Sequence, residues 1–126
     1  MRFIRLLGVV IIFYGLSYLL HGLTQFYWVV QSRALRHVSW YVIATNFNIG
    51  AVTFVIGIGI LLAKEWARTL WLMSSIALLA VHIFYMWLFS GTAGATQQAI
   101  NLFLIIMLAL LSWTKLTKPE VRELFN

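Results

Sequence analysis

The chain has 126 residues, of which 63% are hydrophobic and 10% charged, and its mean hydropathy is +0.94. Soluble domains carry about a quarter charged residues, so this composition excludes an ordinary soluble domain and predicts an all-α, polytopic membrane protein. The formal net charge is +6, but the basic residues stand singly between apolar runs, which argues against a nucleic-acid-binding patch. Because there is no cysteine, disulfides and thiolate metal sites are excluded.

Four apolar segments are each long enough to cross a bilayer core of about 30 Å as a helix. They predict one transmembrane domain over residues 1–126, folded as a four-transmembrane-helix bundle. The expected spans are residues 3–20, 41–63, 69–90 and 95–114. The basic, apolar N-terminus resembles a signal peptide, but no small-residue cleavage site follows Leu20, so we expect an uncleaved first span.

Small residues recur every seven positions in the first two spans and let helix backbones approach closely. We expect these two spans to pack through them: Gly8, Gly15 and Gly22 in the first, and Gly50 and Gly57 in the second. The second span has two small or polar faces. One carries Asn46, Gly50, Thr53 and Gly57, and the other carries Thr45, Asn48, Ala51 and Val55. Two such faces predict two neighbours, either in a bundle centre or in a homo-oligomer.

The segment between the first two spans, residues 21–40, mixes apolar and polar residues and predicts an interfacial amphipathic helix on the outer surface. The alternative is a packed loop whose arginines, Arg33 and Arg36, reach phosphate head groups. After the last span, residues 115–126 form a charged tail. Thr117 and Glu120 fit a capping box, and Pro119 fits a first helical turn, so a short C-terminal amphipathic helix is expected.

Basic residues are distributed unequally between the two sides of the predicted spans. Seven fall on one side: Arg2, Arg5, Lys64, Arg68, Lys115, Lys118 and Arg122. Only Arg33 and Arg36 fall on the other. Under the positive-inside rule this places both termini in the cytoplasm of a bacterium, with the chain in the plasma (inner) membrane. Tryptophans near both boundaries, among them Trp71 and Trp113 inside, predict an aromatic belt.

One polar side chain per span falls at a similar depth, about 9 to 12 Å below the outer boundary at 1.5 Å per residue. These four are Tyr14, Asn48, His82 and Asn101. Tyr85, Gln97 and Gln98 continue the same faces outward, with Arg33 and Arg36 above them. The pattern allows a pocket for a lipid, quinone or other amphiphile. It also fits hydrogen bonds between helices, which is the interpretation that we favour.

The predicted spans contain no set of residues typical of catalysis within the membrane. All three carboxylates, Glu65, Glu120 and Glu123, fall in predicted cytoplasmic segments, and no phosphate-loop, HExxH or GxSxG motif occurs. We therefore predict no catalytic residue, no metal and no cofactor. A haem held by His82 with His21 or His37 and a bound quinone remain less favoured options, and a transporter is the least favoured.

The inner turn Lys-Glu-Trp-Ala-Arg at residues 64–68 and the tail Pro-Glu-Val-Arg-Glu-Leu-Phe at residues 119–125 resemble small bacterial four-helix membrane proteins, including the DUF2127-like and DoxX-like sets. Membership of the DoxX-like set implies links to redox or quinone chemistry, although no functional motif of that set is matched here.

The sequence favours a non-enzymatic accessory or scaffolding subunit, or a homo-oligomer packing through its glycine faces. The alternative is a binding protein for a lipid, quinone or other amphiphile. The expected partners are membrane lipids together with further copies of the chain or another membrane-protein subunit.

Overall fold

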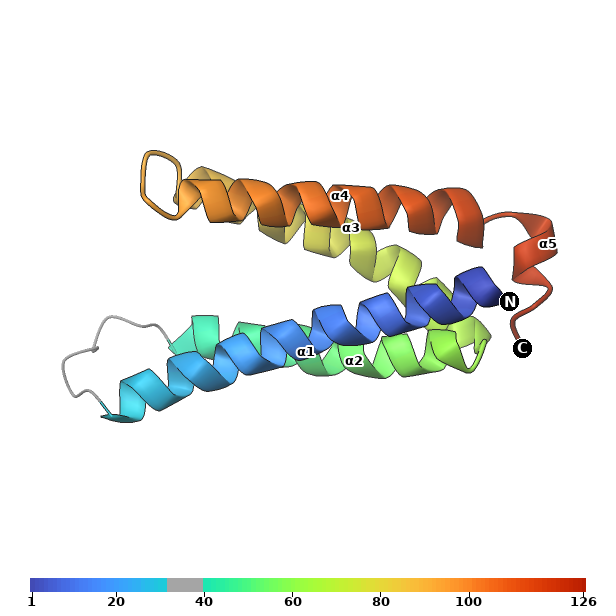
Figure 1. Cartoon of the computed structure of the whole chain (residues 1–126), viewed down its shortest axis with the longest axis horizontal. Coiled ribbons are helices and arrows are strands. Elements are labelled where there is room, and N and C mark those ends of the chain that lie inside the picture. The colour runs from blue at the N-terminus through green and yellow to red at the C-terminus, as the bar shows by residue number, and fades with distance from the viewer. Residues whose placement is uncertain (32–39) are drawn as a thin grey trace. The chain divides into compact units, whose positions relative to one another are not determined.

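The computed structural model describes residues 1–31 and 40–126, and all the regular structure in this part of the chain is helical. In chain order the helices are α1 (Arg2–Gln31), α2 (Trp40–Leu61), α3 (Glu65–Leu88), α4 (Ala95–Leu116) and α5 (Pro119–Arg122) (Figure 1). The chain divides into two compact units, residues 1–67 and 68–126. The first unit holds the α1–α2 pair, and the second holds most of α3 together with α4 and α5.

The four long helices have the length and hydropathy needed to cross a membrane. They contain 22 to 30 residues, and the most apolar 18-residue window of each has a mean hydropathy of 1.7 to 2.1. Each helix also leaves much of its apolar surface uncovered, since only 22 to 44% of each window is buried. The expected all-helical fold with four span-length helices is therefore confirmed, and these features are those of a membrane protein.

The first helix is longer than its predicted span, because α1 continues from residue 20 to Gln31. At 1.5 Å per residue its 30 residues extend for about 45 Å. Residues 21–31 contain no proline, and Gly22 lies against Asn46 and Phe47 of α2. The Asn46 Nδ2 atom also donates a hydrogen bond of 2.7 Å to Gln25 Oε1. Packing against α2 therefore extends the first helix where the sequence predicted a separate interfacial helix.

Glycines bring α1 and α2 into backbone contact. A Cβ atom added to Gly8 would lie 3.1 Å from the Gly57 carbonyl oxygen, and one added to Gly15 would lie 2.9 Å from the Gly50 carbonyl oxygen. Moving seven residues along α1 thus moves the contact seven residues back along α2, which is the register of an antiparallel pair. We call this contact the glycine seam, and it is the predicted meeting of the first two spans.

The turn after α2 has the hydrogen bonds of a Schellman motif. The Lys64 N–H donates to the Gly59 carbonyl at 2.8 Å, and the Ala63 N–H donates to the Ile60 carbonyl at 2.9 Å. Ala63 has a φ of 51°, in the left-handed region that glycine usually occupies at this position. This strained backbone conformation allows the chain to reverse direction within the three residues between α2 and α3.

The C-terminal segment contains a short helix, but it is capped differently from the prediction. The residue before α5 is Lys118, and no side chain caps the helix start. The Thr117 hydroxyl donates instead to the Trp113 carbonyl of α4. The expected capping box of Thr117 and Glu120 is therefore wrong, because the Thr117 side chain is already bonded one turn back. Pro119 does occupy the first turn of α5.

Candidate functional site

The residues of the predicted polar level are divided between the two units. Tyr14 and Asn48 belong to the first unit. The second unit holds His82, Tyr85, Gln97, Gln98 and Asn101. Arg33 and Arg36, expected above this level, lie outside the described residues.

In the first unit, Tyr14 and Asn48 differ in exposure and in their surroundings. Tyr14 is half-buried, and its hydroxyl donates to the Tyr18 hydroxyl at 3.4 Å. The two rings are tilted, with centroids 5.2 Å apart. Asn48 is exposed, on the face of α2 that points away from Gly50. Tyr14 thus contacts Tyr18 of its own helix, while Asn48 faces away from the glycine seam.

In the second unit, His82 is buried, with 2% of its surface exposed. Its Nδ1 atom lies 2.7 Å from the Leu78 carbonyl oxygen, one turn earlier in α3. A carbonyl oxygen only accepts hydrogen bonds, so Nδ1 carries the hydrogen in this contact. The histidine thus reduces the cost of burying its polar ring by bonding to its own helix.

The glutamine and asparagine residues of α4 also bond along their own helix. The Gln97 Nε2 atom donates to Asn101 Oδ1 at 3.0 Å. Gln97 is exposed, while Gln98 and Asn101 are half-buried. Tyr85, one turn beyond His82, is half-buried and makes an edge contact with Phe89 at a centroid distance of 6.5 Å.

The polar residues of the second unit lie on two helices that hydrogen bonds join further along the pair. Trp71 of α3 bonds to Ser112 of α4, and Trp113 of α4 bonds to Ser75 of α3. His82 lies six residues before the end of α3, and Asn101 lies six residues after the start of α4. These two residues are therefore at a similar distance along the chain from the α3–α4 turn, and Tyr85 and Gln98 are each three residues closer to it.

Sequence reasoning missed the polar cluster at the other end of this pair, which we call the Trp–Ser clasp. The Trp71 Nε1–H donates to Ser112 Oγ at 2.7 Å, and the Trp113 Nε1–H donates to Ser75 Oγ at 3.0 Å. Each helix thus contributes one indole and one hydroxyl. The serine hydroxyls donate in turn to backbone carbonyls of their own helices, Ser75 to Leu72 and Ser112 to Leu108.

The clasp changes the interpretation of Trp71. The sequence placed Trp71 in an aromatic belt at the membrane boundary, but its exposed fraction is 0%. Trp113 keeps 39% of its surface exposed, as a belt residue would. The available signal was the spacing of four residues between Trp71 and Ser75, which sets both on one face of α3.

Arg68 lies beside the clasp and is also buried, with 8% of its surface exposed. Its guanidinium donates to the Leu116 carbonyl oxygen at 3.1 Å. Leu116 is the last residue of α4, where backbone carbonyls lack partners within the helix and carry partial negative charge. Arg68 thus ties the start of α3 to the end of α4. The sequence treated it only as a topological charge.

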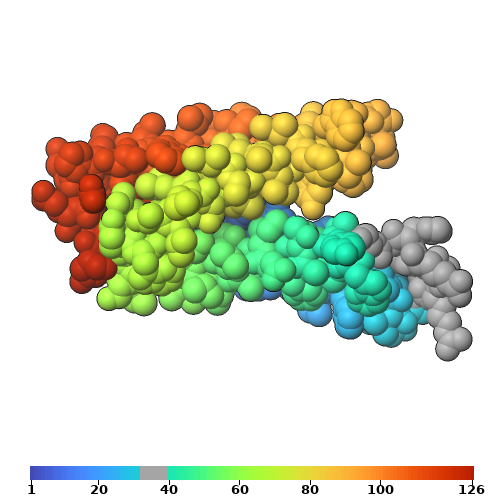
Figure 2. All heavy atoms as spheres, turned by 180° about the vertical axis from the view of Figure 1, so that it is seen from behind, coloured from blue at the N-terminus to red at the C-terminus, as the bar shows by residue number. Residues whose placement is uncertain are grey.

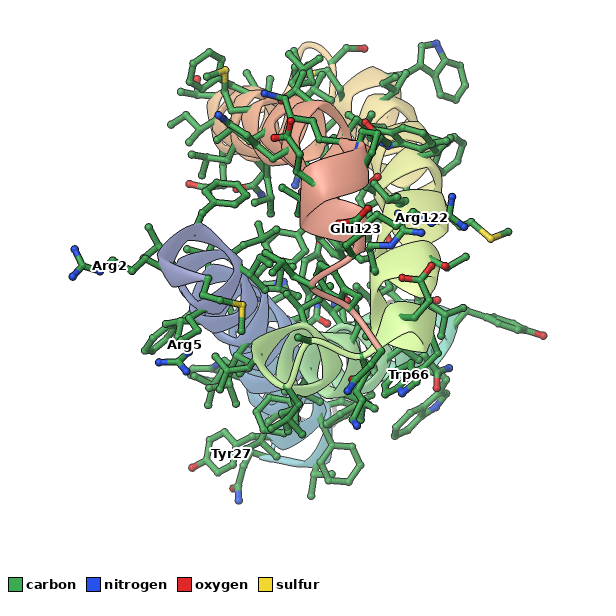
Figure 3. All side chains as sticks on the ribbon, turned by 90° about the vertical axis from the view of Figure 1, so that its right-hand side faces the viewer. Arg2, Arg5, Tyr27, Trp66, Arg122 and Glu123 are labelled. Atoms are coloured by element: carbon green, nitrogen blue, oxygen red, sulfur yellow. The ribbon has the colours of Figure 1, made fainter. Side chains whose placement is uncertain are left out.

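The other basic residues of the predicted inner side are exposed. Figure 3 shows Arg2 and Arg5 extending outward from the first turns of α1. Lys64, directly after α2, lies at the same end of the first unit, since Gly8 meets Leu61 there. In the second unit the bases Lys115, Lys118 and Arg122 cluster around the end of α4 and α5. Each unit therefore has its described basic residues at one end.

The buried polar atoms of the described residues are satisfied, since every buried side-chain nitrogen and oxygen there has a hydrogen-bond partner. No group of three or more His, Cys, Asp or Glu residues able to hold a metal ion occurs among residues 1–31 and 40–126. Of the predicted axial haem ligands, His82 is buried, His21 is exposed and His37 lies outside the described residues.

Comparisons of the chain with protein-family models, curated proteins and solved structures give no match. The structure is a helical chain with four span-length helices, in which α1 and α2 form one hairpin and α3 and α4 form another. The resemblance to the DUF2127-like and DoxX-like sets stays a prediction.

Proposed function

We propose that the chain is a non-enzymatic integral membrane protein that acts as an accessory or scaffolding subunit. The Trp–Ser clasp supports this proposal most directly. Its polar side chains join one helix to another and do not converge on an open surface, which is the use of polar residues expected of a structural membrane protein. The glycine seam supports it in the same way, because its small residues are taken up by backbone contact within the chain.

The proposed location is the plasma membrane of a bacterium, with both termini in the cytoplasm and the four long helices packed as a bundle. Support comes from the basic residues at one end of each unit, where positive charge is retained on the cytoplasmic side. Exposed aromatic side chains at the opposite ends agree with this orientation. Trp28, Trp40 and Trp87 expose 55, 59 and 70% of their surfaces, as residues of an outer membrane interface do.

Chemical crosslinking in native membranes tests the accessory role. We expect the chain to be recovered in a complex larger than the monomer, both by crosslinking and by native electrophoresis after extraction in mild detergent. Recovery as an uncomplexed monomer under both conditions would contradict the proposal.

A second candidate function is binding of a quinone, lipid or other amphiphile. The observation that favours it is that His82 and Tyr85 of α3 and Gln98 and Asn101 of α4 lie at similar distances from the turn that joins these two helices. Native mass spectrometry of the wild-type chain and of His82→Leu would compare any retained small molecule. Identical spectra without an adduct would exclude this candidate, and a visible spectrum of the purified chain would test for haem separately.

A further inference from the structure

The face of α2 that points away from the glycine seam carries an exposed stripe at heptad spacing. Its members recur at alternating intervals of three and four residues, and all of them are exposed: Tyr41, Ala44, Asn48, Ala51, Val55 and Ile58. This is the pattern by which two helices pack with a left-handed crossing of about 20°. Part of the α2 surface is in view in Figure 2, coloured from green to cyan. We call these six residues the α2 stripe.

Asn48 is the polar member of the stripe and lies deep in the helix. As the ninth residue of α2, it is about 12 Å from the helix start at 1.5 Å per residue. Its carboxamide is exposed, and none of the hydrogen bonds between side chains in the described part of the chain involves it. A carboxamide facing hydrocarbon without a hydrogen-bond partner costs free energy. The flanking residues Ala44 and Ala51 are small, so another helix backbone can approach it closely.

We propose that the α2 stripe is the contact between two copies of this chain, and that Asn48 of each copy hydrogen-bonds to its counterpart. Copies in one membrane share an orientation, so their α2 helices run parallel. In a parallel pair each stripe position meets the same position of the partner across a twofold axis. A carboxamide both donates and accepts hydrogen bonds, so Asn48 matches an identical side chain.

Two further features favour a second copy as the occupant. The stripe contains no charged side chain, so nothing in it repels an identical surface. The glycine faces, in contrast, are occupied within the chain and offer no such contact. This inference rests on the proposed function and deepens it, because it names the surface through which the subunit forms an oligomer.

Cysteine crosslinking of the full chain in membranes tests the dimer. Because the wild-type chain has no cysteine, a single introduced thiol reports one position. Under mild oxidation Ala51→Cys is expected to form a disulfide-linked dimer. Leu104→Cys is the matched control, since this residue is also near the middle of its helix and is 58% exposed, and it is expected to stay at background.

Substitution of Asn48 supplies a second readout, the dissociation constant of the dimer measured by energy transfer between labelled copies in micelles. Asn48→Leu is expected to raise this constant about three- to thirtyfold, the range expected for a hydrogen bond between membrane helices. Asn48→Gln keeps a carboxamide and is expected to raise the dissociation constant less than Asn48→Leu does. Far-ultraviolet circular dichroism checks that each variant stays folded.

The dimer is overturned if Ala51→Cys links no better than Leu104→Cys, if it links to a different protein, or if Asn48→Leu leaves the dissociation constant unchanged. Such results leave the accessory role standing where crosslinking in native membranes still gives a larger complex. A monomer in native membranes contradicts that role independently of the Asn48 variants.

Discussion

Gly15 and Gly50 lie so close together that a Cβ atom added to either would stand 2.9 Å from the carbonyl oxygen of the other. The same hypothetical Cβ on Gly15 would lie 2.7 Å from the Phe54 backbone nitrogen. Real Cβ atoms do not approach backbone this closely. The α1–α2 pair therefore depends on the absence of a side chain at these two positions.

Gly15→Ala is expected to destabilise the chain by about 1–3 kcal/mol, the usual cost of overpacking, because helix backbone must move apart to admit the methyl group. Gly22→Ala is the matched control in the same helix. Its added Cβ would meet only side-chain atoms, the nearest at 3.4 Å, and alanine favours helix over glycine by about 1 kcal/mol. Unfolding in mixed micelles, followed by circular dichroism, measures both. Equal effects at the two positions would contradict the glycine seam.

The Trp–Ser clasp predicts energetic coupling between α3 and α4. A double-mutant cycle of Trp71→Phe and Ser112→Ala is expected to give a coupling energy of about 0.6–1.7 kcal/mol, the average and the maximum measured for hydrogen bonds between membrane helices. Unfolding of the wild type, both single variants and the double variant supplies the four values.

Trp87→Phe provides the control for the indole itself, because Trp87 is 70% exposed. It is expected to change the free energy of unfolding by less than about 0.5 kcal/mol. Additive effects of Trp71→Phe and Ser112→Ala would show that the indole and the hydroxyl do not stabilise each other.

Arg68→Met is expected to destabilise the chain by about 1.5–3 kcal/mol, the usual contribution of a hydrogen bond to a charged group. The substitution keeps an unbranched side chain but leaves the Leu116 carbonyl without its guanidinium donor. Lys118→Met, which removes an exposed charge near the same helix end, is expected to stay within about 0.5 kcal/mol of the wild type. Chemical unfolding measures the free energy of unfolding of both variants. A decrease of equal size in both would point to net charge as the cause.

The proposed orientation predicts which introduced cysteines an impermeant maleimide reaches in intact cells. Thr92→Cys, in the exposed turn between α3 and α4, is expected to be labelled from outside. Lys118→Cys, exposed beside α5, is expected to be labelled only after the cells are opened. The opposite pattern would reverse the orientation.

The polar side chains show how far sequence reasoning reached. Depth along each span was calculated from the chain alone, and it placed one polar residue of each span at a similar level. It did not show that His82 bonds to the Leu78 carbonyl or that Gln97 bonds to Asn101, since a side chain's choice between its own helix and a neighbour depends on rotamer and packing. Depth also gave no indication of direction around the helix, which is why Asn48 was grouped with Tyr14 although it faces away from the seam.

By itself the sequence determined the helical class, the four span-length helices and the glycine faces, because these follow from hydropathy and from spacing along one helix. The meeting of the glycine faces of the first two spans was also expected from the sequence. Tertiary structure decided where α1 ends and which distant side chains meet. It showed that α1 extends to Gln31 where Asn46 bonds to Gln25, and that Trp71 is buried against Ser112. Such choices depend on contacts between residues far apart in the chain, which no periodicity within a single segment encodes.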